Sequence, residues 1–179
     1  EGMRITDIDG KTYLDAVSGG VWTVNVGYGR KEIVDAVAKQ MMEMCYFANG
    51  IGNVPTIKFS EKLISKMPGM SRVYLSNSGS EANEKAFKIV RQIGQLKHGG
   101  KKTGILYRAR DYHGTTIGTL SACGQFERKV QYGPFAPGFY EFPDCDVYRS
   151  KFGDCADLGV KMAKQLEEVI LTVGPDELG

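Results

Sequence analysis

The stretch from Val73 to Asn83 constrains the fold of this chain more than any other. It predicts a strand, then a tight turn of Ser and Gly, then the first turn of a helix. This order directs backbone N–H groups, the hydroxyls of Ser78 and Ser80, and the positive end of a helix dipole at one small volume. Gly79 has no Cβ, so its backbone can approach an anion closely. The stretch therefore favours a phosphate site.

The same residues also have a simpler interpretation. Ser78 followed three places later by Glu81 fits a capping box, which needs no ligand. We assign Glu81 to capping of the helix and not to acid–base chemistry. The turn is richer in small donors than capping requires, which favours the phosphate site only slightly, so a second motif has to decide between the two.

The helix after this turn is well specified. Its apolar residues share one face at helical spacing, and they are Ala82, Ala86, Ile89, Val90, Ile93 and Leu96. Lys97 and His98 suit its C-terminal end, and Gly99 and Gly100 stop it. Lys85 and Lys88 lie on the same helix and are expected to be solvated, because lysine is rarely buried without a partner.

A second motif, residues 110–116, follows another predicted strand at 103–107. In an open α/β sheet, ligands collect outside the carboxyl ends of the strands. Tyr112, followed by His113 and Gly114, could place a flat ring beside the phosphate turn. Pyridoxal phosphate (PLP), a flat ring with a phosphate on a short arm, fits both motifs, and it is an electron sink for carbanion chemistry.

With these motifs in place, the chain resembles the class-III, fold-type-I PLP-dependent aminotransferases, especially the branch that uses ω-amino acids and pyruvate. The resemblance runs through the whole chain. Five segments carry it in order: 7–15, 20–22, 25–30, 78–83 and 112–114. The implied fold class is α/β, with an amino-terminal segment and part of the large cofactor-binding domain.

The resemblance also implies site residues. Gly79 and Ser80, with Ser78 beside them, would hold the cofactor phosphate. Tyr112 would stack on the pyridine ring, and His113 would support that stack or be a satisfied core histidine. Trp22 would line the substrate pocket, although a lone Trp in a Gly-rich segment is more often a packing anchor. No catalytic residue is assigned within this chain. The segment 46–48 would lie near a homodimer interface.

The chain differs from the family in extent. The family forms its Schiff base on a lysine downstream of these motifs, and the aspartate that pairs with the ring nitrogen also lies downstream. No lysine here has a matching context. We therefore expect the amino-terminal part of a longer enzyme, with a short leader also missing. Its expected division is 1–55 for the hairpin, Gly-rich segment and first helix, and 56–179 for the start of the large domain.

Composition narrows the class of protein further. The chain is 42% hydrophobic and 25% charged, with a net charge of +2, which is typical of a soluble globular domain. It has no basic tract and no apolar run that approaches a membrane span, so neither a nucleic acid nor a membrane is an expected partner. The four cysteines have no metal-binding spacing, so we expect no metal site and predict reduced, mostly packed thiols in a cytoplasmic protein.

Patterning also predicts the remaining elements. A hairpin is expected over 3–17 with its turn at Asp9–Gly10. Helices are expected over 31–44, with Met41 and Met44 as core filler, and over 56–67, 115–122 and 157–173. Breakers Gly50, Gly52, Asn53 and Pro55 predict a loop, and residues 125–149 predict a long loop over the site.

The expected function is transfer of an amino group from an ω-amino acid or amine, such as taurine or β-alanine, to a keto acid, expected to be pyruvate. Related class-III enzymes act as aminomutases, racemases or decarboxylases, and these alternatives stay open. So does a non-catalytic phosphate-binding α/β module. A nucleotide-binding Rossmann domain is disfavoured because no G-x-G-x-x-G follows a strand.

Overall fold

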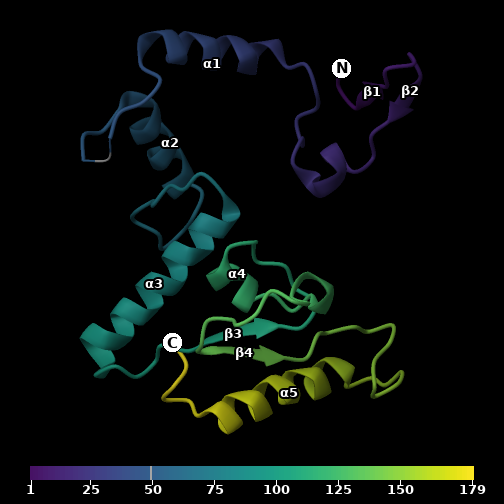
Figure 1. The fold of residues 1–179 in the computed structure, drawn as a ribbon, viewed down its shortest axis with the longest axis vertical. Helices are drawn as coiled ribbons and strands as arrows, with labels where there is room; N and C mark the ends of the chain where they lie inside the picture. Colours follow the sequence, from purple (N-terminus) through teal and green to yellow (C-terminus); the bar gives the residue numbers. More distant parts are fainter. Residues whose placement is uncertain (49) are drawn as a thin grey trace. The chain divides into compact units, whose positions relative to one another are not determined.

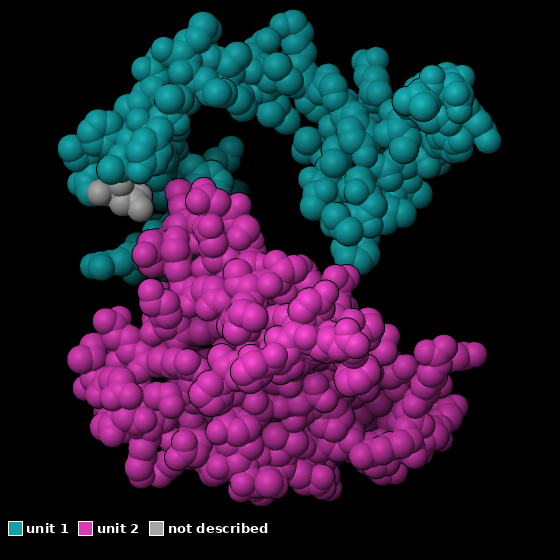
Figure 2. All heavy atoms as spheres, viewed as in Figure 1, with its two compact units in different colours: residues 1–73 teal, residues 74–179 magenta. Residues whose placement is uncertain are grey.

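The computed structural model describes residues 1–48 and 50–179. They form two compact units, residues 1–73 and residues 74–179, shown in teal and magenta in Figure 2. These units are parts of this chain, whereas the expected division at residue 55 concerns domains of a longer enzyme and stays a prediction.

The first unit opens with the expected hairpin. Strands β1 (Arg4–Thr6) and β2 (Thr12–Leu14) pair antiparallel with Ile5 opposite Tyr13. The carboxylate of Asp7 organises the turn, because it accepts hydrogen bonds from the backbone N–H groups of Asp9 and Lys11 at 3.0 and 2.9 Å and from the Tyr13 hydroxyl at 2.9 Å. Gly10 takes a φ of +83°, a conformation that favours glycine at this corner.

A Gly-rich π-turn, η1 (Ser18–Trp22), follows, and then helices α1 (Lys31–Glu43) and α2 (Val54–Ile64). Helix α2 begins earlier than expected. Asn53 caps it by accepting from the Thr56 N–H at 2.9 Å, and Pro55 stands in its first turn, where its missing N–H costs nothing. Pro55 was therefore wrongly interpreted as a breaker.

No described residue of the first unit is buried. The apolar side of α1 is exposed, with Met41 62% accessible and Met44 37%, so the prediction that these methionines fill a core is wrong for this unit. Amphipathic spacing identified the face, but no described element of this unit covers it.

The second unit begins with an extended segment and the long helix α3 (Gly79–His98). The predicted strand at 72–75 is wrong: these residues form no strand, since no described segment pairs with them. Helix α3 starts and ends as expected, with Ser78 as its cap and Gly99 in the left-handed conformation at φ +61°.

The predicted apolar face of helix α3 packs only in part, through the half-buried Val90. Ile89, Ile93 and Leu96 are 45, 43 and 78% exposed, whereas Gly94 is buried and Phe87 is half-buried. The Phe87 ring meets the Phe139 ring edge-on, with centroids 5.1 Å apart. A Cβ on residue 94 would lie 2.4 Å from the Lys101 carbonyl oxygen, so glycine permits the close return of the chain after the helix.

Strand β3 (Ile105–Arg108) pairs in parallel with β4 (Phe139–Phe142), with Ile105 opposite Phe139. The crossover between them contains α4 (Ile117–Ser121) and the short 3-10 turn η2 (Phe126–Arg128). The prediction of an irregular loop over residues 125–149 is therefore wrong in part, because β4 lies within it. Leu178 bridges in parallel to Gly104, so the end of the chain also runs beside β3.

Helix α5 (Leu158–Val173) packs against β4, and in the view of Figure 1 the two strands lie between α4 and α5. Its predicted inner face is confirmed, with Leu158 buried and Met162, Leu166, Val169, Ile170 and Val173 half-buried. The best-buried part of the unit is the end of α4 and the residues after it, where Thr119 and Cys123 are fully buried.

Candidate functional site

The N-terminus of α3 presents unused hydrogen-bond donors. The Ser78 hydroxyl oxygen accepts from the Glu81 N–H at 3.1 Å, and a Glu81 carboxylate oxygen accepts from the Asn77 N–H at 2.9 Å. Glu81 therefore caps the helix, as expected. Capping leaves the N–H groups of Gly79 and Ser80 without acceptors among the described residues.

These donors suit a phosphate. The hydroxyls of Ser78 and Ser80 each accept one hydrogen bond and have their own O–H groups free to donate. A Cβ built on Gly79 meets nothing within 4 Å, so the space beside its amide is open. Two amides, two hydroxyls and the positive end of the α3 dipole fit an anion of this shape.

The second motif reaches the first through Ser80. The Ser80 hydroxyl oxygen accepts from the Thr115 N–H at 3.1 Å. Asn83, one turn along α3, donates from its side-chain amide to the His113 carbonyl at 2.8 Å. Gly114 is buried between them, and a Cβ there would lie 2.5 Å from the Ser80 hydroxyl oxygen. The two predicted motifs are thus held together by direct contacts.

The loop from Ala109 to Gly114 is fixed on its other side by the chain after α4. Gly124 exchanges backbone hydrogen bonds with it, accepting from the Arg110 N–H and donating to the Asp111 carbonyl, both at 2.9 Å. The Cys123 thiol is the acceptor for the His113 N–H at 3.1 Å and the donor to the Gly114 carbonyl at 3.4 Å. This accounts for the burial of Cys123. By contrast, Cys45 and Cys145 are exposed, so the expectation of mostly packed thiols is wrong for those two.

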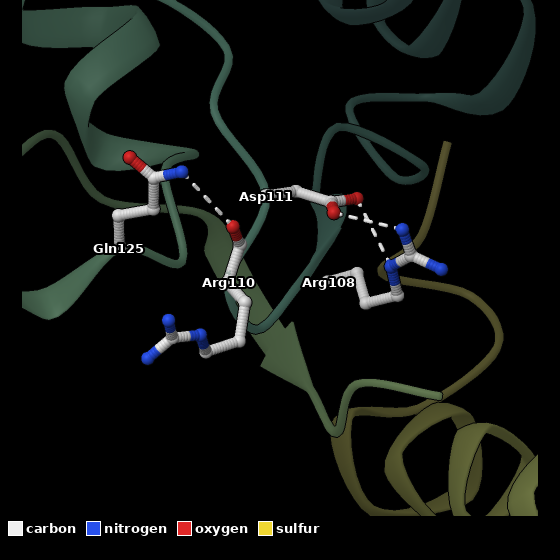
Figure 3. Close-up of polar contacts among 4 residues, drawn as sticks. All are labelled: Arg108, Arg110, Asp111 and Gln125. Carbon is white, nitrogen blue, oxygen red and sulfur yellow. Dashed lines mark hydrogen bonds and ion pairs between the residues drawn. The ribbon is translucent and has the colours of Figure 1, made fainter. Parts of the chain in front are cut away.

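Side chains brace the start of the same loop (Figure 3). Arg108 donates from Nε and a terminal nitrogen to the two oxygens of Asp111, at 3.1 and 2.8 Å. This two-point pair raises the pKa of the Arg108 guanidinium above its ordinary value. Gln125 donates from its side-chain amide to the Arg110 carbonyl at 3.2 Å. Arg110 itself stands at φ +71°, a conformation that these contacts hold.

Tyr112 emerges from this braced loop with its side chain 50% exposed. Its ring borders a pocket of about 400 Å³, and the guanidinium carbon of Arg128 lies 4.8 Å from its ring centroid. The residues that line the pocket are Tyr112, Gly114, Thr115, Ile117, Leu120, Glu127, Arg128 and Tyr132. An accessible aromatic ring on a loop that is bonded to the N-terminus of α3 could hold a flat cofactor ring. His113 is half-buried and is held through its backbone.

Trp22 belongs to the first unit, at the end of η1. Its indole is 76% exposed, so it does not anchor a core there. The η1 turn is held instead by Asp15, whose carboxylate accepts from the Gly19 N–H and the Tyr28 hydroxyl, both at 2.7 Å. These bonds lower the pKa of Asp15 and raise the pKa of Tyr28.

The sequence did not indicate several residues that shape the site. Glu84 accepts from the Thr119 N–H at 3.2 Å and from the Thr116 hydroxyl, and so joins α3 to the start of α4. Lys85 was expected to be solvated, but it donates to the Leu75 carbonyl at 2.6 Å and lies over the Tyr74 ring. Lys88 is exposed, as expected. For Glu84, its position one turn beyond the Ser–Gly turn was the only available signal.

The described residues contain neither a candidate metal site nor a helix that could span a membrane. Residues 1–48 and 50–179 contain no group of three or more His, Cys, Asp or Glu side chains that could bind a metal ion. The same residues contain no helix with the length and apolar composition that a bilayer crossing requires.

Comparison with known proteins places these features in context. The family model for class-III aminotransferases matches residues 1–177. The chain is 56% identical over 178 residues to a taurine–pyruvate aminotransferase of Rhodobacter capsulatus, covering 99% of this chain and 39% of that protein. It is 57% identical over 179 residues to a hypotaurine/taurine–pyruvate aminotransferase of Paracoccus denitrificans, again covering 39% of the relative. The chain thus spans about two fifths of the length of these relatives.

A solved structure of a transaminase is also similar to this chain. The PLP-bound amine transaminase from an uncultivated Pseudomonas species superposes with a TM-score of 0.92 at 32% identity, covering 99% of this chain and 41% of that one.

Proposed function

The chain belongs to the class-III aminotransferases and has the α/β fold of the corresponding part of fold-type-I transaminases, and from this premise we propose that the complete protein is a PLP-dependent transaminase. Its substrates in this proposal are an ω-amino acid or aminosulfonate as donor and pyruvate as acceptor. Two relatives of more than 55% identity that act on taurine and pyruvate, by their names, support this choice. In this proposal, the residues of this chain bind and orient the cofactor.

The observation that carries the proposal is the contact between the two motifs. The bond from the Thr115 N–H to the Ser80 hydroxyl joins the N-terminus of α3, with its free amides and hydroxyls, to the loop that presents Tyr112, and this supports the proposal. A capping box alone would not need this second motif, and a simple phosphate site would not need an exposed aromatic ring next to it. Together they match a flat cofactor with a phosphate arm.

We assign the holding of the phosphate to the amides of Gly79 and Ser80 and to the hydroxyls of Ser78 and Ser80. These groups are already oriented before binding, so little order has to be gained when the phosphate arrives. Ser80 keeps its orientation because the Thr115 N–H occupies one of its lone pairs. These groups would hold the phosphate end of PLP in one position throughout the reaction.

Tyr112 would limit the tilt of the cofactor ring, and His113 would support the loop behind it. Bound PLP supplies an electron sink that stabilises the carbanion formed at the donor carbon. Hydrogen bonds with Asn83, Cys123 and Gly124 hold the backbone of the loop from which the Tyr112 side chain projects. Trp22 is proposed to line the substrate pocket of the assembled enzyme.

A homodimer is part of the proposal. The resemblance implies that residues 46–48 would lie near a subunit interface, and the exposure of Tyr46 and Phe47, 79 and 51% in the first unit, supports this proposal. Light scattering of the complete protein tests this point. A monomer at micromolar concentration would contradict it.

The test of function uses the complete protein loaded with PLP. Incubation with taurine or β-alanine and pyruvate should yield alanine, measured by chromatography. A racemase, aminomutase or decarboxylase would instead convert the amino compound without forming alanine from pyruvate. A phosphate-binding module without catalysis would bind PLP and turn over neither substrate.

A further inference from the structure

Arg128 is a cation without a counter-ion in the wall of the pocket beside Tyr112. The ion pairs of the described residues do not include it, although Glu127 lines the same pocket. A guanidinium stays charged at all physiological pH values. The wall of this pocket therefore carries, beside the Tyr112 ring, a guanidinium that forms no ion pair with a described carboxylate.

Arg128 is also held in position. Its Nε donates to the side-chain oxygen of Gln125, and the amide nitrogen of Gln125 donates to the Arg110 carbonyl at 3.2 Å. The guanidinium carbon lies 4.8 Å from the Tyr112 ring centroid. The loop that positions Tyr112 thus positions Arg128 too. The two terminal nitrogens have no acceptors among the described residues.

The neighbouring lysine makes a useful contrast. Lys129 donates to the Tyr107 hydroxyl at 3.2 Å and to the Ser121 carbonyl at 3.3 Å. Its ammonium group also lies 4.9 Å from the Tyr107 and Phe135 ring centroids. Lys129 is engaged in packing, whereas Arg128 has an open pair of donors.

From this arrangement we propose that Arg128 determines donor specificity by binding the acidic end of the amine donor, a sulfonate or a carboxylate. The planar fork of a guanidinium matches two oxygens of either group. A pocket of about 400 Å³ has room for a donor with a two-carbon chain. The inference rests on the proposed function, because it concerns the donor of that reaction.

The experiment measures the donor half of the reaction in the complete, PLP-loaded protein without any keto acid. Absorbance of the cofactor follows the rate with taurine and with 2-aminoethyl methyl sulfone, which has the same chain and amine but no anionic group. Omitting the keto acid removes the carboxylate of pyruvate from the comparison. Arg128→Gln is compared with Arg149→Gln, which removes an exposed arginine that lines a different pocket.

Arg128→Gln removes the charge-assisted hydrogen bonds that the guanidinium would donate to the sulfonate of taurine. The second-order rate constant for taurine should therefore fall about 10–100-fold. The constant for the sulfone should change by less than about 3-fold, because its neutral sulfonyl group makes no ion pair with the guanidinium. Arg128→Lys keeps the charge but loses the fork, so it should lie between wild type and Arg128→Gln. Arg149→Gln should behave as wild type with both donors.

A binding measurement gives a second readout that needs no turnover. Isethionate has the sulfonate of taurine but no amine, and calorimetry with the PLP-loaded protein should show its dissociation constant about 10-fold higher in Arg128→Gln. An unchanged ratio of taurine to sulfone rates, or unchanged isethionate affinity, would overturn the role of Arg128. The wild-type protein could fail to form alanine from pyruvate with every donor tested, while Arg128→Gln still weakens the binding of isethionate. That result would contradict the proposed function but would support Arg128 as the binding site for the acidic group.

Discussion

Gly114→Ala should weaken the second unit at the point where the two motifs meet. Gly114 has a φ of +139°, where an L side chain is strained. The new Cβ would lie 2.5 Å from both the Ser80 and Thr119 hydroxyl oxygens. Neither oxygen can withdraw freely, because Ser80 accepts from the Thr115 N–H and Thr119 is fully buried.

The magnitude follows from two contributions. An unfavourable backbone conformation costs about 1–3 kcal/mol. Forcing a methyl group into a filled site costs about 1–3 kcal/mol more. Their sum is about 2–6 kcal/mol of unfolding free energy, and displacement of Ser80 should also raise the dissociation constant of PLP.

Urea unfolding of the complete apo protein measures this loss, since leaving out PLP removes stabilisation by the ligand. Gly159→Ala is the matched control. Gly159 lies in α5, a Cβ there meets nothing within 4 Å, and alanine should stabilise that helix by about 0.5–1 kcal/mol. A Gly114→Ala protein as stable as wild type would refute the proposed close contact between Ser80 and the Tyr112 loop.

Three further outcomes are expected. Ser80→Ala removes one phosphate donor and the acceptor for Thr115, so PLP affinity, measured by fluorescence titration, should fall about 3–10-fold, and unchanged affinity would contradict the assignment. Tyr112→Ala should shift the absorbance band of the bound cofactor and weaken its binding, whereas Tyr112→Phe keeps the stack and should preserve both. The hydrogen bond from the Gly19 N–H lowers the pKa of Asp15 in the folded protein. The ionised carboxylate therefore stabilises the η1 turn fully above its unfolded pKa of about 3.9, and this stabilisation is lost as the pH falls through the lower folded pKa. Protection of the Gly19 amide from hydrogen exchange, relative to the intrinsic rate at each pH, should fall in that acidic range, and Asp15→Asn should remove this pH dependence.

The sequence predicted correctly those features that depend on interactions between residues close together in the chain. Ser78 and Gly99 set the two ends of α3 because a cap and a left-handed stop act within one turn of the helix. The hairpin turn at Gly10 was predictable for the same reason. The small residues and hydroxyls of the phosphate turn were also visible in the sequence, since consecutive residues provide all of its donors.

Elements that depend on distant partners were not predictable in this way. β4 lies in a segment rich in Gly, Pro and aromatics, and it is a strand because β3 accepts it in parallel from more than thirty residues away. Residues 72–75 have the composition of a strand, yet no described segment pairs with them. The apolar stripe on α3 includes Val90, which is half-buried, and Ile89, Ile93 and Leu96, which are exposed, but only the tertiary structure shows that Phe87 and Gly94 pack as well.

The sequence by itself indicated the family, the Ser–Gly turn before α3 and the aromatic motif at residues 112–114, because short runs of residues encode each of them. Only the tertiary structure decided that Thr115 bonds to Ser80 and that Arg128 lies over Tyr112. Both contacts join residues that the chain brings together by folding β3, α4 and η2 back toward α3. The spacing of residues in the sequence does not predict these contacts, because packing and hydrogen bonds between separate elements stabilise them.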